Sequence, residues 1–108
     1  MTLPPATKMI TDYRGRKIRL TDERWQHAIE HAEMAGQLSR LGWTLRSPDR
    51  VLRSRLDTSV HLYYRWFPRT PVTSKHLMVA VKDLDDDAFV ITAFFTGEVR
   101  GGAEIWAK

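Results

Sequence analysis

The stretch that decides the fold is "FVITAFFTGEV", residues 89–99. Alternation divides its first eight residues between two sides of a strand, with Phe89, Ile91, Ala93 and Phe95 on one and Val90, Thr92, Phe94 and Thr96 on the other. The second side joins two threonines to two apolar residues. Such a side is typical either of partly buried sheet or of a site that uses hydroxyl groups. The pattern alone leaves both interpretations open.

Three further segments have the character of strands, and short turn-like connections separate them. The four expected strands are residues 50–56, 60–67, 75–82 and 88–96. Short connections favour antiparallel neighbours, so we expect a four-stranded antiparallel β-meander. "RKIRL", residues 16–20, fits a short strand or an extended lead-in, and "GEVRGGAEIW", residues 97–106, can add a short edge piece.

The segment before the strands is expected to be helical. In "LTDERWQHAIEHAE", residues 20–33, Thr21 is a good N-cap and two acidic residues follow it in the first turn. The apolar stripe changes phase near Met34, which predicts two helices, residues 22–31 and 33–46, with a bend between them. The expected fold class is therefore α+β, with N-terminal helices followed by the four-stranded antiparallel meander and lying on one of its faces.

Length and composition predict one folded domain. The chain has 108 residues, so we expect a flexible N-terminal segment over residues 1–15 and a single domain over residues 16–108. No apolar run approaches the length of a membrane span, and the first residues lack the continuous apolar core of a secretory signal. There is no cysteine. These features together favour a cytoplasmic protein that does not contact a membrane.

The charge distribution points to a partner with phosphate groups. The net charge is +4, and arginine outnumbers lysine. Between residues 40 and 69 there are seven arginines and two aspartates. The planar guanidinium group suits phosphate, so this region favours nucleic acid as a partner. A solvated basic surface balanced by the acidic turn "KDLDDD", residues 82–87, is the alternative.

Two histidines precede the expected bend. His27 and His31 have the i, i+4 spacing that can hold a metal, but the zincin motif needs a glutamate where the chain has Ala28, and no third ligand is evident. We therefore expect no metal site and no cofactor. His31 lies near the expected end of the first helix, where a charged imidazole is favoured, which makes it a candidate general acid or base. A surface or capping histidine is the other interpretation.

A set of cationic and hydroxyl side chains is expected on the side of the sheet away from the helices. Its members are Arg53, Arg55, Tyr63, Arg65, Lys82, Thr92 and Thr96. On rigid strands these groups suit an RNA phosphate and the charge that develops on it, and tyrosine can stack on a base. The same residue types are also common on a solvent-facing sheet surface.

Four blocks of the sequence support a family resemblance. "LTDERWQHAIEHAE", "SPDRVLRSRLDTSVHLYYRWF", "TPVTSKHLMVAVK" and "DDAFVITAFFT" resemble successive blocks of a phage-type branch of the barnase–EndoU–colicin–RelE (BECR) nuclease superfamily, over residues 17–106. The resemblance implies a RelE-like fold of helices followed by a four-stranded sheet. It also implies a metal-independent, toxin-like endoribonuclease, in which the ribose 2′-OH attacks the phosphate to leave a 2′,3′-cyclic phosphate. The matching positions are His31, residues 53–55 and 63–65, Lys75, Lys82, Thr92 and Thr96.

With this resemblance, roles can be assigned to the residues. We expect His31 to be the general base or acid, and Tyr63 to be the second proton carrier or a base-stacking platform. Arg55 would hold the phosphate and its developing charge, and Thr92 and Thr96 would donate hydrogen bonds to it. The expected substrate-binding residues are Arg53, Arg65, Lys75 and Lys82.

The expected partners follow from the same resemblance. They are RNA and an antitoxin or immunity protein that holds the activity in check. Two alternatives remain open on the same fold. One is a module that binds RNA without cleaving it, and the other is an interaction protein of a mobile element that presents Tyr63, Tyr64 and Trp66 to a protein partner.

Overall fold

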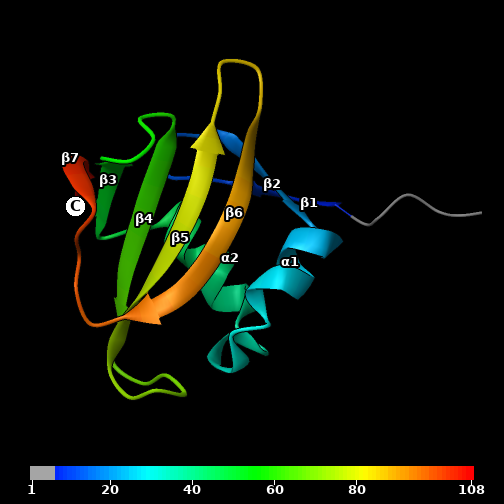
Figure 1. The fold of residues 1–108 in the computed structure, drawn as a ribbon, viewed down its shortest axis with the longest axis vertical. Helices are drawn as coiled ribbons and strands as arrows, with labels where there is room; N and C mark the ends of the chain where they lie inside the picture. The colour runs from blue at the N-terminus through cyan, green and yellow to red at the C-terminus, as the bar shows by residue number, and fades with distance from the viewer. Residues whose placement is uncertain (1–6) are drawn as a thin grey trace, which may run out of the picture.

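A mixed β-sheet forms the body of the protein, with short helices against one of its faces (Figure 1). The computed structural model describes residues 7–108. Its strands are β1 (Thr7–Thr11), β2 (Lys17–Thr21), β3 (Arg50–Ser54), β4 (Val60–Phe67), β5 (Lys75–Asp83), β6 (Ala88–Thr96) and β7 (Gly102–Ala107). Within residues 7–108 they form one seven-stranded sheet in the order β1-β2-β6-β5-β4-β3-β7.

The predicted fold of N-terminal helices followed by a four-stranded meander is wrong. A hairpin of β1 and β2 precedes the helices, and β7 adds a strand at the opposite edge. The sheet is mixed because β2 runs parallel to β6, where Arg19 pairs with Phe89. Residues 7–11 were expected to belong to a flexible segment, but alternation there buries Ile10 and pairs β1 with β2. Residues 1–6 of that segment lie outside the described residues.

The helical elements are shorter than predicted. They are α1 (Asp22–Ala28), a single 3-10 turn η1 (Ala32–Met34) and α2 (Leu38–Arg46). The predicted N-cap is confirmed, since Thr21 Oγ1 accepts a hydrogen bond from the Arg24 N–H at 3.1 Å. Gly36 lies between η1 and α2 with a φ of +77°, a left-handed conformation that ends helical structure and suits glycine. No helix in residues 7–108 is long and apolar enough to cross a membrane.

The main core lies between the helices and one face of the sheet. Met34, Leu41 and Leu45 from the helical segment are fully buried against strand residues such as Val79 and Val81. Full burial of each large apolar side chain contributes about 1.5–3 kcal/mol to stability. In Figure 1, α2 lies behind the sheet and α1 lies beside β6. The helices therefore cover one face and leave the other uncovered, and we call these the covered face and the open face.

A β-bulge in β6 changes the alternation expected for residues 89–96. Ala80 of β5 pairs with Thr92, but the next residue, Val81, pairs with Val90, so Ile91 is an extra residue in β6. Val90 and Ala93 are consequently both buried in the main core. The bulge explains the mixture of threonine and apolar residues predicted for one side: Val90 faces the helices, whereas Thr92, Phe94 and Thr96 share the open face.

Candidate functional site

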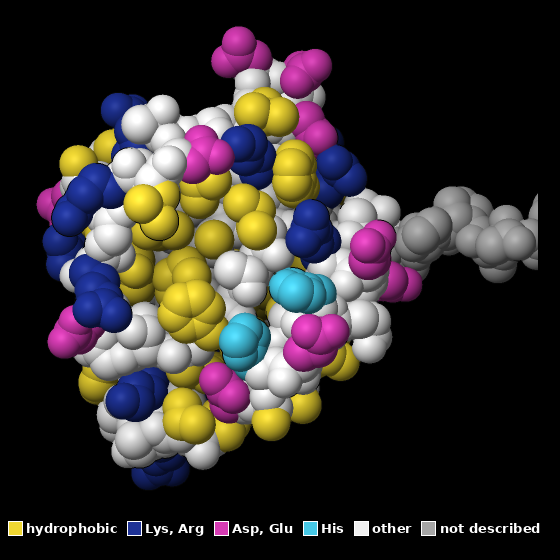
Figure 2. Space-filling view, in the orientation of Figure 1, with side chains coloured by type: hydrophobic (Ala, Val, Ile, Leu, Met, Phe, Trp, Pro, Cys, Tyr) yellow, Lys and Arg dark blue, Asp and Glu magenta, His cyan; other side chains and the backbone are white. Residues whose placement is uncertain are grey.

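The centre of the open face is apolar. Leu52, Tyr64, Met78 and Ala80 form a second buried cluster there, and Phe94 is one of the partly buried residues packed around it. Figure 2 shows hydrophobic side chains gathered in the middle of this face, with lysine and arginine along its left and upper margins and histidine on the side nearer α1. A face of this kind, with an apolar centre and a cationic margin, suits a partner that has both flat rings and negative charge.

A shallow hollow of about 280 Å³ opens at this centre. Leu62, Met78 and Phe94 contribute apolar wall, and Thr96 and Arg100 add polar groups. The register places Met78 directly opposite Phe94, and Tyr64 opposite Met78, so the wall crosses three adjacent strands. Since the walls are strand residues, the hollow is built on the rigid part of the fold.

Three of the predicted site residues face this open side. Thr92 pairs with Ala80 and Thr96 pairs with His76, so the two hydroxyl groups lie on the same side of β6, with Phe94 between them. Lys82 lies at the other end of the face, where its Nζ donates to Asp57 Oδ2 at 2.6 Å. The hydrogen bond from Lys82 and a further one from Ser59 lower the pKa of Asp57 to about 2. The Lys82 ammonium group is therefore already paired with a carboxylate.

Tyr63 lies on the covered face, so its predicted place beside the other site residues is wrong. Its side chain is fully buried, and its hydroxyl group donates to Asp12 Oδ2 at 2.6 Å. Burial, together with this hydrogen bond, raises the pKa of the tyrosine. Sequence reasoning failed here because the more apolar side of β4, which carries Val60, Leu62 and Tyr64, faces the open side, whereas the more polar side, which carries Tyr63, faces the main core.

Three cationic residues that were predicted to bind substrate also lie away from the open face. Arg65 lies over the Trp43 ring at 4.5 Å and donates to the Ser47 carbonyl oxygen at 2.5 Å. Arg53 follows the core residue Val51 by two positions in β3, so both side chains point to the covered side. Lys75 precedes the core residue Leu77 by two positions in β5, so it also points to the covered side.

Arg55 is placed differently from the other predicted arginines. It follows the last residue of β3, and its backbone N–H donates to the Gly101 carbonyl oxygen at 2.8 Å. Arg55 is exposed to solvent. Arg55 is therefore at the margin of the sheet, away from the strand positions that hold Thr92 and Thr96.

His31 lies beside β6, although it is outside the helix in which it was predicted. It is an exposed residue between α1 and η1, where its N–H donates to the Ala28 carbonyl oxygen at 3.2 Å. Its ring centroid is 6.1 Å from that of Phe94. The imidazole is thus at the border of the open face, next to the apolar centre and beside the strand that carries both threonines.

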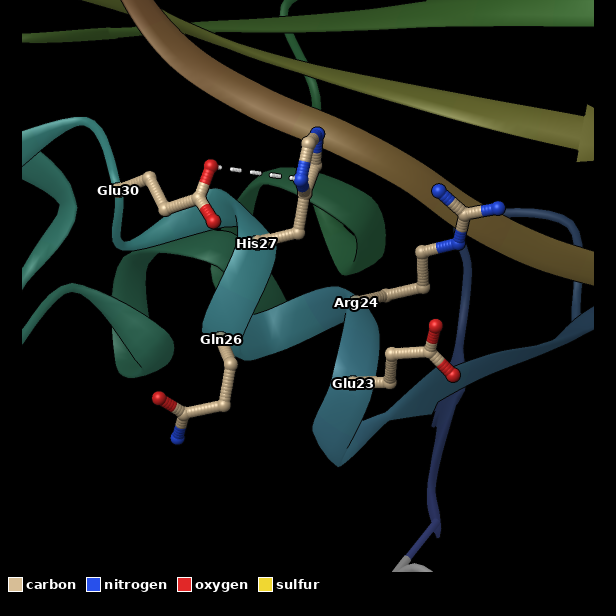
Figure 3. Close-up of a pocket in the computed structure, with 5 residues that line it drawn as sticks. All are labelled: Glu23, Arg24, Gln26, His27 and Glu30. Carbon is tan, nitrogen blue, oxygen red and sulfur yellow. Dashed lines mark ion pairs between the residues drawn. The ribbon is translucent and has the colours of Figure 1, made fainter.

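Two residues of α1 approach the same strand. Figure 3 shows Arg24 and His27 extending from the helix toward β6, while Gln26 points away. These side chains, with Glu23 and Glu30, line a hollow of about 340 Å³ on the outer side of α1. Glu30 Oε2 lies 3.6 Å from His27 Nδ1, and the other ring nitrogen of His27 lies on the side of β6. The carboxylate can therefore orient the imidazole.

These residues define a cluster that we call the β6 site. Its members are Arg24, His27, His31, Thr92, Phe94 and Thr96. Sequence analysis missed Arg24 and Phe94 and considered His27 only as a metal ligand. The available signal was the spacing of Arg24, His27 and His31, which places all three on one side of a helix. No group of three or more histidine, aspartate or glutamate residues within residues 7–108 is arranged to hold a metal ion.

The β6 site combines four kinds of group that phosphoryl chemistry uses. It has two imidazoles for proton transfer, a guanidinium group for negative charge, two hydroxyl groups as hydrogen-bond donors and an aromatic ring. No family model matches the chain, and no curated protein or solved structure matches it. What the β6 site does must therefore be inferred from its residues and from the sequence resemblance.

Proposed function

We propose that the protein is an endoribonuclease that needs no metal ion and that the β6 site is its active site. One observation carries this proposal: the imidazoles of His27 and His31 approach, from the α1 side, the strand that presents Thr92 and Thr96. Cleavage of RNA by its own 2′-OH group requires two proton transfers and stabilisation of one phosphate, and the β6 site contains groups for each.

The reaction would proceed by internal displacement. The ribose 2′-oxygen forms a bond to phosphorus while a general base removes its proton. The bond from phosphorus to the 5′-oxygen of the next nucleotide breaks, and a general acid gives that oxygen a proton. The products are a 2′,3′-cyclic phosphate and a 5′-hydroxyl end, so no external reactant is consumed.

His27 and His31 are proposed as the two proton-transfer residues. The Glu30 carboxylate near His27 Nδ1 stabilises the tautomer in which the nitrogen facing β6 has the lone pair, which is the form of a general base. His31 would then be the general acid. Tyr63 cannot fill this position because it is buried on the covered face.

The remaining residues of the β6 site would hold the substrate. Arg24 extends toward β6 and is proposed to bind the phosphate, with Thr92 and Thr96 donating hydrogen bonds to its oxygens. Phe94 would stack on a base. Single-stranded RNA is the substrate class that fits, since a base can reach an aromatic ring on the sheet only when it is unstacked.

The biological setting is part of the proposal. A nuclease of this kind would act in the cytoplasm, where its substrate is present, and would be toxin-like, with an antitoxin or immunity protein as inhibitor. The cationic margin of the open face supports a partner with phosphate groups.

The experiment that tests this proposal is incubation of the protein with total RNA in EDTA, followed by end-group analysis. Cleavage with 2′,3′-cyclic phosphate ends is expected. His31→Ala should lower the rate by about a thousandfold, the range typical of losing a general acid or base. Gln26→Ala is the matched control, since Gln26 is on the same helix and points away from β6.

Each other result has a definite meaning. If RNA is retained but not cut, the open face is an RNA-binding surface without catalysis. If RNA is neither cut nor retained, the apolar centre is better explained as a contact for a protein. Equal cleavage by the wild-type protein and the His31→Ala variant would remove His31 from the active site.

A further inference from the structure

Strand β1 is the outermost strand on its side of the sheet. It pairs with β2 at five consecutive positions, from Thr7↔Thr21 to Thr11↔Lys17, without any shift in register. On its other side no strand in residues 7–108 pairs with it. The outward backbone N–H and C=O groups of a regular edge strand are a template on which a further strand can form.

A groove runs beside this edge, between β1 and α2. It has a volume of about 180 Å³ and is lined by Lys8, Ile10, Leu38, Ser39, Gly42 and Arg46. Ile10 and Leu38 give it an apolar floor. The absence of a side chain at Gly42 lets the Arg46 guanidinium group lie against the helix, because a Cβ there would be 3.1 Å from Arg46 Nη1.

Within the part of the chain that the structure describes, the cations of this groove have no acidic partner. The ion pairs within residues 7–108 involve neither Lys8 nor Arg46. Most other basic residues near the hairpin are paired, such as Arg19 with Asp87 at 2.7 Å. The groove therefore offers an apolar floor and two positive charges, next to an edge strand that no other strand in residues 7–108 pairs on its outer side.

We propose that β1 is the docking site for an extended segment of a partner protein whose groove-facing side chains, at every second position, include both acidic and apolar groups. The segment would add an eighth strand at β1. Side chains on one side of that strand would enter the groove, with an apolar group on Ile10 and Leu38 and carboxylates near Lys8 and Arg46. A second copy of this chain fits less well, since its own β1 would bring further positive charge to the same groove.

The opposite edge of the sheet lacks these features. Strand β7 has a register shift against β3 between Val51 and Leu52, and its Glu104 is already paired with Arg50 at 2.5 Å. A bulged edge strand with a carboxylate would not favour an acidic strand. The docking proposal is therefore specific to β1, and it is independent of the proposed nuclease activity.

The test uses a short labelled peptide with glutamate, valine and glutamate at every second position and threonine between them, titrated with the protein and followed by fluorescence anisotropy. Binding is expected, and the same peptide with lysine in place of glutamate should not bind. Lys8→Glu and Arg46→Glu should each weaken binding by about tenfold, as expected for a desolvated charge pair. Arg69→Glu, in the loop between β4 and β5, is the control that should have no effect, and circular dichroism checks that each variant is folded.

Two peptides methylated on alternate backbone nitrogens make the test specific for strand addition. One set of amides must face β1 and the other must face solvent, so one methylated peptide should bind and the other should not. Equal binding of both, or binding of the lysine peptide, would overturn the proposal. It would also be overturned by no binding at all, or by a β1-dependent dimer of the protein in sedimentation.

Discussion

Tyr63 and Tyr64 are neighbours in β4, yet they belong to opposite faces of the sheet. Tyr63 points to the covered face, where its hydroxyl group donates to the buried carboxylate of Asp12 at 2.6 Å. Tyr64 points to the open face, where its hydroxyl group donates to the Arg100 carbonyl oxygen at 2.7 Å. The difference teaches that the polar groups of the covered face hold the fold together, whereas those of the open face border an apolar surface that the helices leave uncovered.

The covered face contains a polar network anchored on Asp12. Besides the Tyr63 hydroxyl group, the Asp12 carboxylate accepts hydrogen bonds from the backbone N–H groups of Arg14 and Arg16 at 2.9 and 2.8 Å. Arg14 continues the network to Asp83 at 2.7 Å. These contacts join the turn after β1 to β4 and β5. Buried groups satisfied in this way are costly to disturb, which gives the largest predicted effect.

Asp12→Ala should lower the free energy of unfolding by about 3 kcal/mol, because a buried hydroxyl group and two backbone N–H groups lose their acceptor. Urea unfolding followed by circular dichroism measures the loss. Asp57→Ala is the control: Asp57 is an exposed carboxylate at the border of the open face, and its removal should change stability little. Equal losses in the two variants would break the distinction between the faces.

Phe94→Ala tests whether the open face binds RNA through its aromatic centre. We expect the affinity for single-stranded RNA to fall by about 2 kcal/mol, or roughly 30-fold, which is typical of losing one stacked base. Anisotropy with a labelled oligonucleotide measures this change. Trp43 on α2 is an aromatic residue on the covered side that is more exposed than Phe94, so RNA affinity should be unchanged in Trp43→Ala. A similar loss in both variants would argue against a base-stacking role for Phe94.

The two tyrosines themselves give the next effect. Tyr63→Phe removes a hydrogen bond to a buried carboxylate and should cost about 1.5 kcal/mol of stability. Tyr64→Phe removes a hydrogen bond to a backbone carbonyl group at a partly solvated position and should cost about 0.5 kcal/mol. Parallel urea titrations compare them. If Tyr64→Phe is the more damaging change, the open face has a larger structural role than its exposure indicates.

Local patterns in the sequence predicted the positions of several elements. The Thr21 N-cap and the alternating segments at β3 to β6 are short-range features, and these lie where the sequence indicated. The complete fold was not predictable in the same way. Strand β2 pairs with β6 through Arg19 and Phe89, which are 70 residues apart in the chain, and a single parallel residue pair leaves no periodic signal in either segment.

The candidate site was predictable only where alternation within a single strand decides which side chains share a face. Thr92 and Thr96 were found because they alternate within one strand beyond the bulge. Tyr63 and Arg65 were assigned to the wrong face because they lie on the more polar side of β4, and in this strand the more polar side is the one that faces the main core. His31 was placed in a helix, but that helix ends at Ala28, and the His31 ring lies 6.1 Å from the Phe94 ring at the border of the open face.

The smallest predicted effect is a pH dependence of stability, to which one histidine on each face of the sheet contributes. Burial lowers the pKa of His61 on the covered face and of His76 on the open face, and the Asp83 carboxylate 3.3 Å from His61 Nδ1 does not reverse it. The unfolded chain therefore binds protons at these histidines at a higher pH than the folded protein does. Stability is expected to fall as the pH falls through the ordinary histidine pKa of about 6.5.

Two variants separate the contributions to this pH dependence. The urea midpoint of the wild-type protein should decrease between about pH 7.5 and pH 5.5, and His61→Gln and His76→Gln should each reduce the decrease. Tyr63 does not titrate in this range, because its pKa is raised. If His61→Gln removes the whole decrease, the covered face alone controls stability in this pH range. The other outcome is that His76→Gln reduces the pH-dependent decrease as much as His61→Gln does. In that case the His76 ring beside Trp66 is as firmly packed as the core, and the open face is more rigid than the comparison of the two tyrosines indicates.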